Sequence, residues 1–216
     1  MTDSNYAHIS IVADRSGSMG LRTEIGGPLK CDVATKGIHE FVTEQRKLPG
    51  KTTFSLTDFD TEYTHVASFT DGSLLLGWKC SPRNGTALLD AVGFEITKLG
   101  EALEKMPEHE RPGRVYVVIA TDGQENSSTE YTLEQVRDMI THQHDAYGWE
   151  FVFVGAGPEA WGGGAAMGIA ASATLDADVA AMAVTYSASS AAVSRSRAGG
   201  QSVSYTDEER QSVRKH

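Results

Sequence analysis

Short apolar runs rich in β-branched residues alternate with longer stretches of helical periodicity. This alternation constrains the fold of the chain more than any other feature of the sequence. The clearest run is Arg114–Thr121 (RVYVVIAT), and its unbroken apolar character is typical of a strand buried on both faces. Similar runs lie at Ala7–Ala13 and Trp149–Gly155. The pattern predicts an α/β fold: a Rossmann-like, doubly wound and mostly parallel central sheet with helices on both faces.

Two neighbouring β-rich runs, Thr52–Phe59 and Glu62–Phe69, are separated only by Asp60 and Thr61. So short a connection predicts a hairpin, and therefore one antiparallel strand at an edge of the sheet. Apolar residues at helical spacing, or an alanine-rich composition, predict the helices between the strands. The expected helices are Cys31–Lys47, Thr86–Lys105, Thr132–Ala146 and Ala177–Arg195, and a weak last strand is expected at Ile169–Leu175.

The chain of 216 residues is expected to form one domain at 1–198, followed by a polar tail at 199–216. Hydrophobic residues make up 40% and charged residues 22% of the sequence, which is typical of soluble globular domains. α/β domains of this length are commonly undivided. The tail has no clear core pattern, and one short docked helix is expected in it at Asp207–Arg214.

Composition argues against several classes of partner. A net charge of -10 disfavours binding to phosphate backbones, so no nucleic-acid partner is expected. No apolar run reaches the roughly 18 residues of a membrane span, and no signal peptide is visible at the start of the sequence. Two cysteines without a CxxC motif fit a reducing compartment. The expected location is therefore the cytoplasm, without a membrane partner.

Polar side chains follow the expected strands at the positions where α/β sheets bind ligands. Asp14, Ser16 and Ser18 come directly after the first run, and Asp122 follows the clearest strand. Thr86 stands at the start of the second expected helix. Carboxylate and hydroxyl oxygens are the ligands that Mg²⁺ prefers, in near-octahedral geometry. The pattern therefore predicts a metal site formed by these five residues.

Such a ligand set has a chemical consequence. With few carboxylates, a bound cation stays strongly electrophilic and keeps a position open for an acidic side chain of a partner. Gly17 allows a tight turn between Ser16 and Ser18. Each residue also has a purely structural interpretation, because Asp, Ser and Thr are favoured at helix caps and turns.

At these residues the sequence resembles the von Willebrand factor type A (vWA) domain. The metal-ion-dependent adhesion site (MIDAS) of that family has the pattern Asp-x-Ser-x-Ser, then a Thr, then an Asp. The matching residues are Asp14, Ser16, Ser18, Thr86 and Asp122. The stretch Asn-Gly-Thr-Ala-Leu-Leu-Asp-Ala at 84–91 matches as well, and the resemblance covers about residues 5 to 195 in the expected order.

The resemblance implies a Rossmann-like sheet with Mg²⁺ or Mn²⁺ at its edge, in a binding module that is not an enzyme. Because it is short, single-domain and without a visible signal, the chain looks like intracellular bacterial and bacteriophage-encoded members. Some bacterial members work beside an AAA+ ATPase, so an AAA+ ATPase or its substrate is an expected partner. The loop from Met19 to Lys30 looks long for the family, and the tail beyond Gly199 lies outside the pattern.

Two other functional classes compete with a metal-dependent binding module. A structural or assembly protein, such as a bacteriophage component, would use the metal only to stabilise its loops, and the sequence leaves this alternative open. A metal-dependent phosphohydrolase would need a second acid two residues after Asp14, where Ser16 stands. No GxSxG or P-loop motif supports another hydrolase or nucleotide-dependent chemistry.

Overall fold

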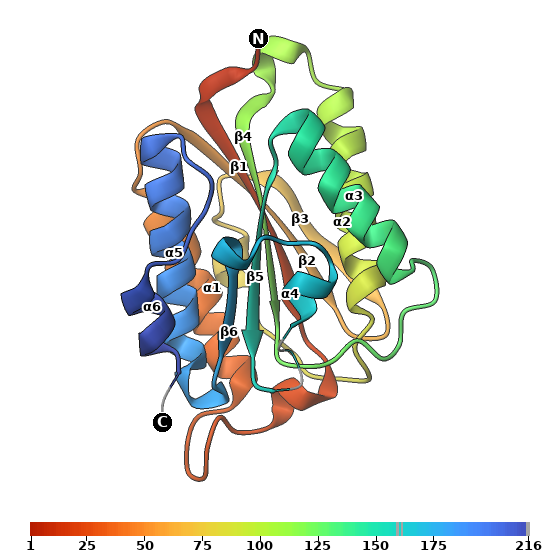
Figure 1. Cartoon of the computed structure of the whole chain (residues 1–216), viewed down its shortest axis with the longest axis vertical. Coiled ribbons are helices and arrows are strands. Elements are labelled where there is room, and N and C mark those ends of the chain that lie inside the picture. The colour runs from red at the N-terminus through yellow and green to blue at the C-terminus, as the bar shows by residue number, and fades with distance from the viewer. Residues whose placement is uncertain (159, 161, 215–216) are drawn as a thin grey trace.

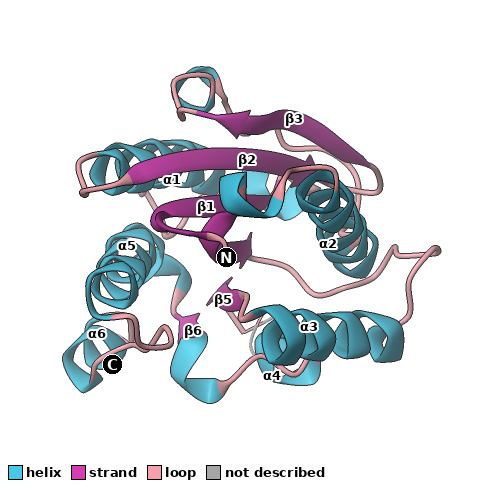
Figure 2. Ribbon diagram, turned by 90° about the horizontal axis from the view of Figure 1, so that it is seen from above, coloured by secondary structure: helices cyan, strands magenta, loops and turns pink. Residues whose placement is uncertain are grey.

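The computed structural model describes residues 1–158, 160 and 162–214, in which six strands form one sheet in the order β3-β2-β1-β4-β5-β6 (Figure 1). Helices cover both faces of this sheet (Figure 2). The strands are β1 (Asp3–Asp14), β2 (Lys51–Phe59), β3 (Tyr63–Thr70), β4 (Pro112–Thr121), β5 (Glu150–Ala156) and β6 (Thr174–Ala177). The helices are α1 (Lys30–Arg46), α2 (Leu88–Glu104), α3 (Leu133–Tyr147), α4 (Gly163–Ala166), α5 (Met182–Gly199) and α6 (Asp207–Ser212).

Every neighbouring pair of strands is parallel except β2 and β3, which are antiparallel. The short β2–β3 connection is held by a hydrogen bond from the backbone N–H of Asp60 to the carbonyl of Glu62, at 2.8 Å. β3 lies at the edge of the sheet, as the hairpin spacing predicts. The predicted α/β fold, with a mostly parallel sheet and one antiparallel edge strand, is therefore confirmed.

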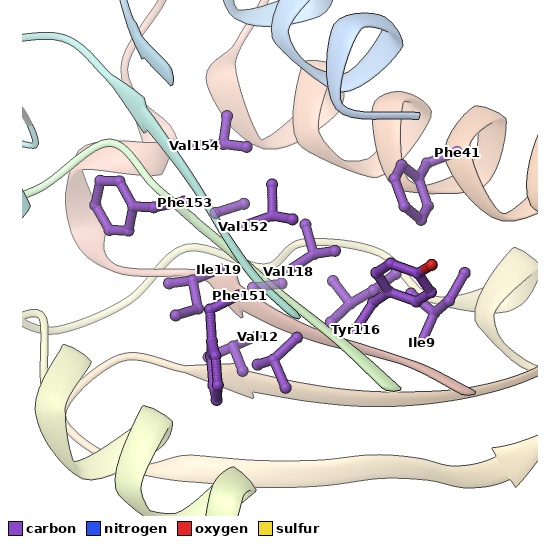
Figure 3. Close-up of a cluster of buried hydrophobic side chains, with 14 of the residues drawn as sticks. Ile9, Val12, Phe41, Tyr116, Val118, Ile119, Phe151, Val152, Phe153 and Val154 are labelled. Atoms are coloured by element: carbon purple, nitrogen blue, oxygen red, sulfur yellow. The ribbon is translucent and has the colours of Figure 1, made fainter. Parts of the chain in front are cut away.

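Helices α1 and α5 lie on one face of the sheet, and α2 and α3 on the other (Figure 2). The core has two corresponding halves, because successive side chains of a strand point to opposite faces. In β5, Phe151 and Phe153 alternate with Val152 and Val154, and all four are at most 5% exposed (Figure 3). Within the described part of the chain, no helix is long and apolar enough to cross a bilayer.

The last strand and the last long helix both begin about five residues later than the sequence predicts. β6 is Thr174–Ala177, where a strand at Ile169–Leu175 is expected, and α5 is Met182–Gly199, where a helix at Ala177–Arg195 is expected. Ile169 is buried, but it precedes a 3-10 turn instead of opening a strand. Alanine and serine dominate this stretch and fit several conformations, so tertiary packing sets these boundaries.

The segment after Gly199 packs against the rest of the molecule. α6 begins with a capping box, in which the Thr206 hydroxyl accepts from the N–H of Glu209 and the Glu209 carboxylate accepts from the N–H of Thr206. Val203, Tyr205 and Val213 are between 0% and 6% exposed. Three apolar side chains are too few to produce a recognisable core pattern in a polar sequence, although they are enough to hold this segment in place.

A buried histidine joins β1 to β2. His8 has no exposed surface, and its Nδ1 and Nε2 atoms are hydrogen-bonded to Thr53 Oγ1 at 2.9 Å and to Ser55 Oγ at 3.1 Å. Its ring stacks on Phe69, with 4.0 Å between centroids. Burial lowers the pKa of His8 to about 3, so the ring is neutral in the folded protein at pH 7.

Candidate metal centre

The candidate site lies where the direction of chain winding reverses. From β1 the chain passes through α1 to β2 on one side, whereas from β4 it passes through α3 to β5 on the other. β1 and β4 are parallel neighbours, with Ala13 opposite Ala120. Loops that leave such a pair of strands diverge and form a ligand-binding crevice at the carboxyl ends. Asp14 ends β1 at this point, and Asp122 directly follows β4.

The five predicted ligands converge at the carboxyl ends of these two strands. The hydroxyl oxygens of Ser16 and Ser18 are 3.0 Å apart, and Ser18 Oγ donates to Asp122 Oδ1 at 2.7 Å. Thr86 reaches the same place, because a Cβ added to Gly123 would lie 3.1 Å from Thr86 Oγ1 and 3.6 Å from Ser18 Oγ. Gly123 therefore lets the Asp122 loop approach both hydroxyls closely.

Asp14 is held next to this group by two short hydrogen bonds. Its Oδ1 accepts from the N–H of Ser16 at 2.6 Å, and its Oδ2 accepts from Thr121 Oγ1 at 2.5 Å. Asp14 is 2% exposed, and burial raises its pKa to about 6, with a further contribution from the nearby Asp122 carboxylate. A cation between these acids would offset the cost of burying their charge.

The ammonium group of Lys30 places a positive charge of the protein itself at this site. Its Nζ lies 2.6 Å from Asp122 Oδ2, and the side chains of Lys30 and Asp122 are only 10% and 0% exposed. Lys30 ends the long loop that follows Ser18 and begins α1. The sequence gives Lys30 no evident role, because a lysine at a helix start has the usual pattern of a solvated side chain. No sequence signal could have indicated its contact with Asp122.

Backbone contacts join the first and second loops of the site. The N–H of Gly17 donates to the carbonyl of Asn84 at 2.9 Å, and the N–H of Arg83 donates to the carbonyl of Arg15 at the same distance. A Cβ on Gly17 would lie 3.0 Å from the backbone oxygen of Asn84, so a larger side chain would push the two loops apart by a few tenths of an ångström. Gly17 therefore allows the loop after β1 to approach the backbone of Asn84 closely. This role is additional to the turn that it allows between Ser16 and Ser18.

Arg15 ties these loops to the β2–β3 hairpin. Its guanidinium contacts Asp60 Oδ2 at 2.8 Å and Asp58 Oδ1 at 3.2 Å, and all three side chains are largely buried. The carbonyl of Asp60 also accepts from the N–H of Ala87 at 2.6 Å, next to Thr86. Asp58 and Asp60 therefore fix the positions of the loops that carry the candidate ligands.

The donor atoms of the candidate site fit a hard divalent cation. Two carboxylates and three hydroxyls offer only oxygen, which suits Mg²⁺ or Mn²⁺ better than a soft thiolate-seeking metal. Among the residues that the structure describes, no three His, Cys, Asp or Glu side chains gather as a metal cluster. A cation here would consequently depend on the serine and threonine hydroxyls for much of its coordination.

Comparisons with known proteins support the fold. No protein-family model and no curated protein matches the sequence. The structure is similar to the vWF domain of the pilus tip protein Mfa5 from Porphyromonas gingivalis, with a TM-score of 0.66, 12% identity, and coverage of 93% of this chain and 98% of that one. It also resembles manganese-loaded TRAP protein from Plasmodium vivax, with a TM-score of 0.60, 12% identity, and coverage of 84% and 72%.

A third similar structure is proximal thread matrix protein 1 from the mussel byssus. Its TM-score is 0.61 at 17% identity, over 88% of this chain and 46% of that protein, and it has also been solved with a zinc-occupied MIDAS motif. This chain thus spans less than half of the mussel protein. These similarities show that the chain has the fold of a von Willebrand factor type A domain, as the sequence motifs predict.

Proposed function

We propose that this protein is a metal-dependent protein-binding module that uses Mg²⁺ or Mn²⁺ to bind an acidic group of a partner protein. The proposed metal ligands are Asp14, Ser16, Ser18, Thr86 and Asp122. The observation that carries the proposal is the convergence of hydroxyl and carboxylate oxygens, with Ser18 Oγ 3.0 Å from Ser16 Oγ and 2.7 Å from Asp122 Oδ1. The zinc-occupied MIDAS motif of the mussel protein and the manganese-loaded TRAP protein support the choice of a divalent cation.

The geometry favours binding over catalysis. Asp14 is the acid that would act as a nucleophile in a phosphohydrolase, but it is only 2% exposed and presents almost no surface to a phosphoryl group. Ser16 also stands where such an enzyme needs its second acid. The proposed function is therefore that of a non-enzymatic module.

The partner we propose carries an exposed carboxylate that completes the coordination of the metal. Following the resemblance to bacterial vWA proteins, we place this partner among AAA+ ATPases or their substrates in the cytoplasm, or in the host cytoplasm if the chain is phage-encoded.

A structural or assembly role is the second candidate. The observation that favours it is the Lys30–Asp122 ion pair, which can hold the loops in place without any metal. In that case a metal would at most stiffen the loops, and Ser16→Ala with Ser18→Ala would leave assembly intact.

The test is thermal unfolding of the chelated protein with and without millimolar Mg²⁺ or Mn²⁺. Binding at 100 times Kd stabilises the native state by about 2.7 kcal/mol, which raises the Tm of a chain this long by about 5–10 °C. Asp14→Ala should abolish the shift. Asp145→Ala, an exposed acid on α3, is the matched control and should keep it. No shift in the wild type would refute the proposed metal site.

A further inference from the structure

Lys30 is the cationic side chain that contacts the candidate site, although it is not one of the predicted ligands. The two oxygens of Asp122 are both engaged: Oδ1 accepts from Ser18, and Oδ2 accepts from the Lys30 ammonium at 2.6 Å. With 10% of its side chain exposed, Lys30 is buried far more than a lysine usually is. The ammonium thus binds the same carboxylate that the proposed function assigns to a metal.

Charge decides whether both cations can be present. Asp14, Asp122 and Lys30 together carry a formal charge of -1, which becomes -2 when the lysine is removed. A divalent cation beside a fixed ammonium in a poorly solvated site is strongly repelled, because the repulsion between like charges grows as the local dielectric constant falls. One carboxylate therefore cannot bind both cations closely at low cost.

The loop that carries Lys30 also begins at a proposed ligand. The carbonyl of Ser18 accepts from the N–H of Leu21, and the carbonyl of Leu21 accepts from the N–H of Lys30, each at about 2.9–3.0 Å. An isolated antiparallel bridge pairs Arg22 with Leu29. The loop projects beyond the carboxyl ends of the strands, at the lower end of the molecule in Figure 1. Ile25 at the tip of the loop is fully exposed, so a partner protein can contact this side chain.

We propose that Lys30 is a tethered cation that competes with the divalent metal for Asp122 and thereby sets the metal affinity of the site. When metal binds, the ammonium leaves Asp122 and becomes accessible to solvent, and the Met19–Lys30 loop shifts with it. This inference rests on the proposed metal site, and it adds that metal occupancy is linked to the position of a loop with an exposed apolar tip.

The first experiment measures Mn²⁺ binding by titration calorimetry for the wild type, Lys30→Met and Lys36→Met. Lys36 is the matched control, because it lies on the same helix with 77% of its side chain exposed. We expect Lys30→Met to bind Mn²⁺ roughly tenfold tighter or more, because a competing positive charge is gone. Lys36→Met should bind like the wild type. The chelated Lys30→Met protein should also melt at a lower temperature than the wild type, because Asp122 loses its partner.

The second experiment needs no variant, so it holds even if Lys30→Met does not fold. The wild-type protein is acetylated with an amine reagent in chelator or in Mn²⁺, and each lysine is followed by mass spectrometry. Lys30 should react faster in Mn²⁺, whereas Lys36 should react equally in both.

Equal or weaker Mn²⁺ binding by a Lys30→Met protein that folds, or unchanged acetylation of Lys30 in a wild type that binds Mn²⁺, would overturn the competition and leave the proposed metal site standing. Absence of Mn²⁺ binding in all three proteins would instead refute the proposed function, and this inference with it.

Discussion

Acid should weaken this fold in a measurable way through one buried side chain, His8. In the folded protein its ring is hydrogen-bonded to Thr53 and Ser55, stacked on Phe69, and has no exposed surface. Burial lowers its pKa to about 3, whereas a histidine in an unfolded chain titrates near 6.5. Between these two pH values the unfolded chain takes up a proton that the folded protein does not.

The sign and size of the effect follow from this difference. The stability that the neutral ring contributes is fully present above pH 6.5 and is lost progressively as the pH falls toward 3. Each pH unit in that window costs about 1.4 kcal/mol. Moving from pH 7.5 to pH 5.0 should therefore remove about 2 kcal/mol from the free energy of unfolding through His8 alone.

The assay is urea unfolding in chelator at pH 7.5 and 5.0, for the wild type and for His8→Gln. Glutamine keeps a polar group between the strands but does not titrate, so its variant should lose about 2 kcal/mol less on acidification. The contributions of other titrating groups are the same in both proteins and therefore cancel in this comparison. One of them is Asp14, whose raised pKa makes the fold more stable on acidification. An equal loss in both proteins would refute the assignment of His8 as the acid-sensitive group.

Three further substitutions test other parts of the structure. Arg15→Met removes the cation that Asp58 and Asp60 share, while Arg83 still pairs with Asp60 at 2.6 Å, so urea unfolding should show a loss of about 1.5–3 kcal/mol; a loss below about 1 kcal/mol would contradict the ion pairing. Thr132→Ala removes the capping box of α3 and should cost about 1 kcal/mol in the same assay, with the calorimetric Kd for Mn²⁺ unchanged. Phe153→Ala leaves a cavity beside β5 and should cost about 3–5 kcal/mol, and a wild-type urea midpoint would show that this side chain is not tightly packed.

The sequence was sufficient to predict the sheet because its central strands are buried on both faces. β1 and β4 have nearly continuous apolar runs, which differ clearly from the amphipathic pattern of the helices. The hairpin between β2 and β3 was equally clear from its short connection. The boundaries of β6 and α5 were wrong because alanine and serine carry little positional information, and the packing of Ile169 and its neighbours decides them.

The candidate site was predictable where it depends on the chain order of strands and loops. The convergence of Ser16, Ser18 and Asp122 follows from the meeting of neighbouring parallel strands at one edge. The contact of Lys30 with Asp122 was not predictable, since it joins residues 92 positions apart through the conformation of a long loop. The ion pairs of Arg15 were missed for the same reason, because burial of a charged side chain depends on its partners and not on its own type.

The candidate site is spread over three separate segments, and Ser18 meets Asp122 across 104 positions of the chain. No excised peptide would therefore retain it: a fragment that ends before β4 would contain the Asp-x-Ser-x-Ser stretch but lack the acid that completes the arrangement. Grafting that stretch onto an unrelated scaffold should likewise transfer no affinity. Inheriting or engineering the site therefore requires the whole sheet with its strand order and connections. A short linear motif supplies only some of the ligands.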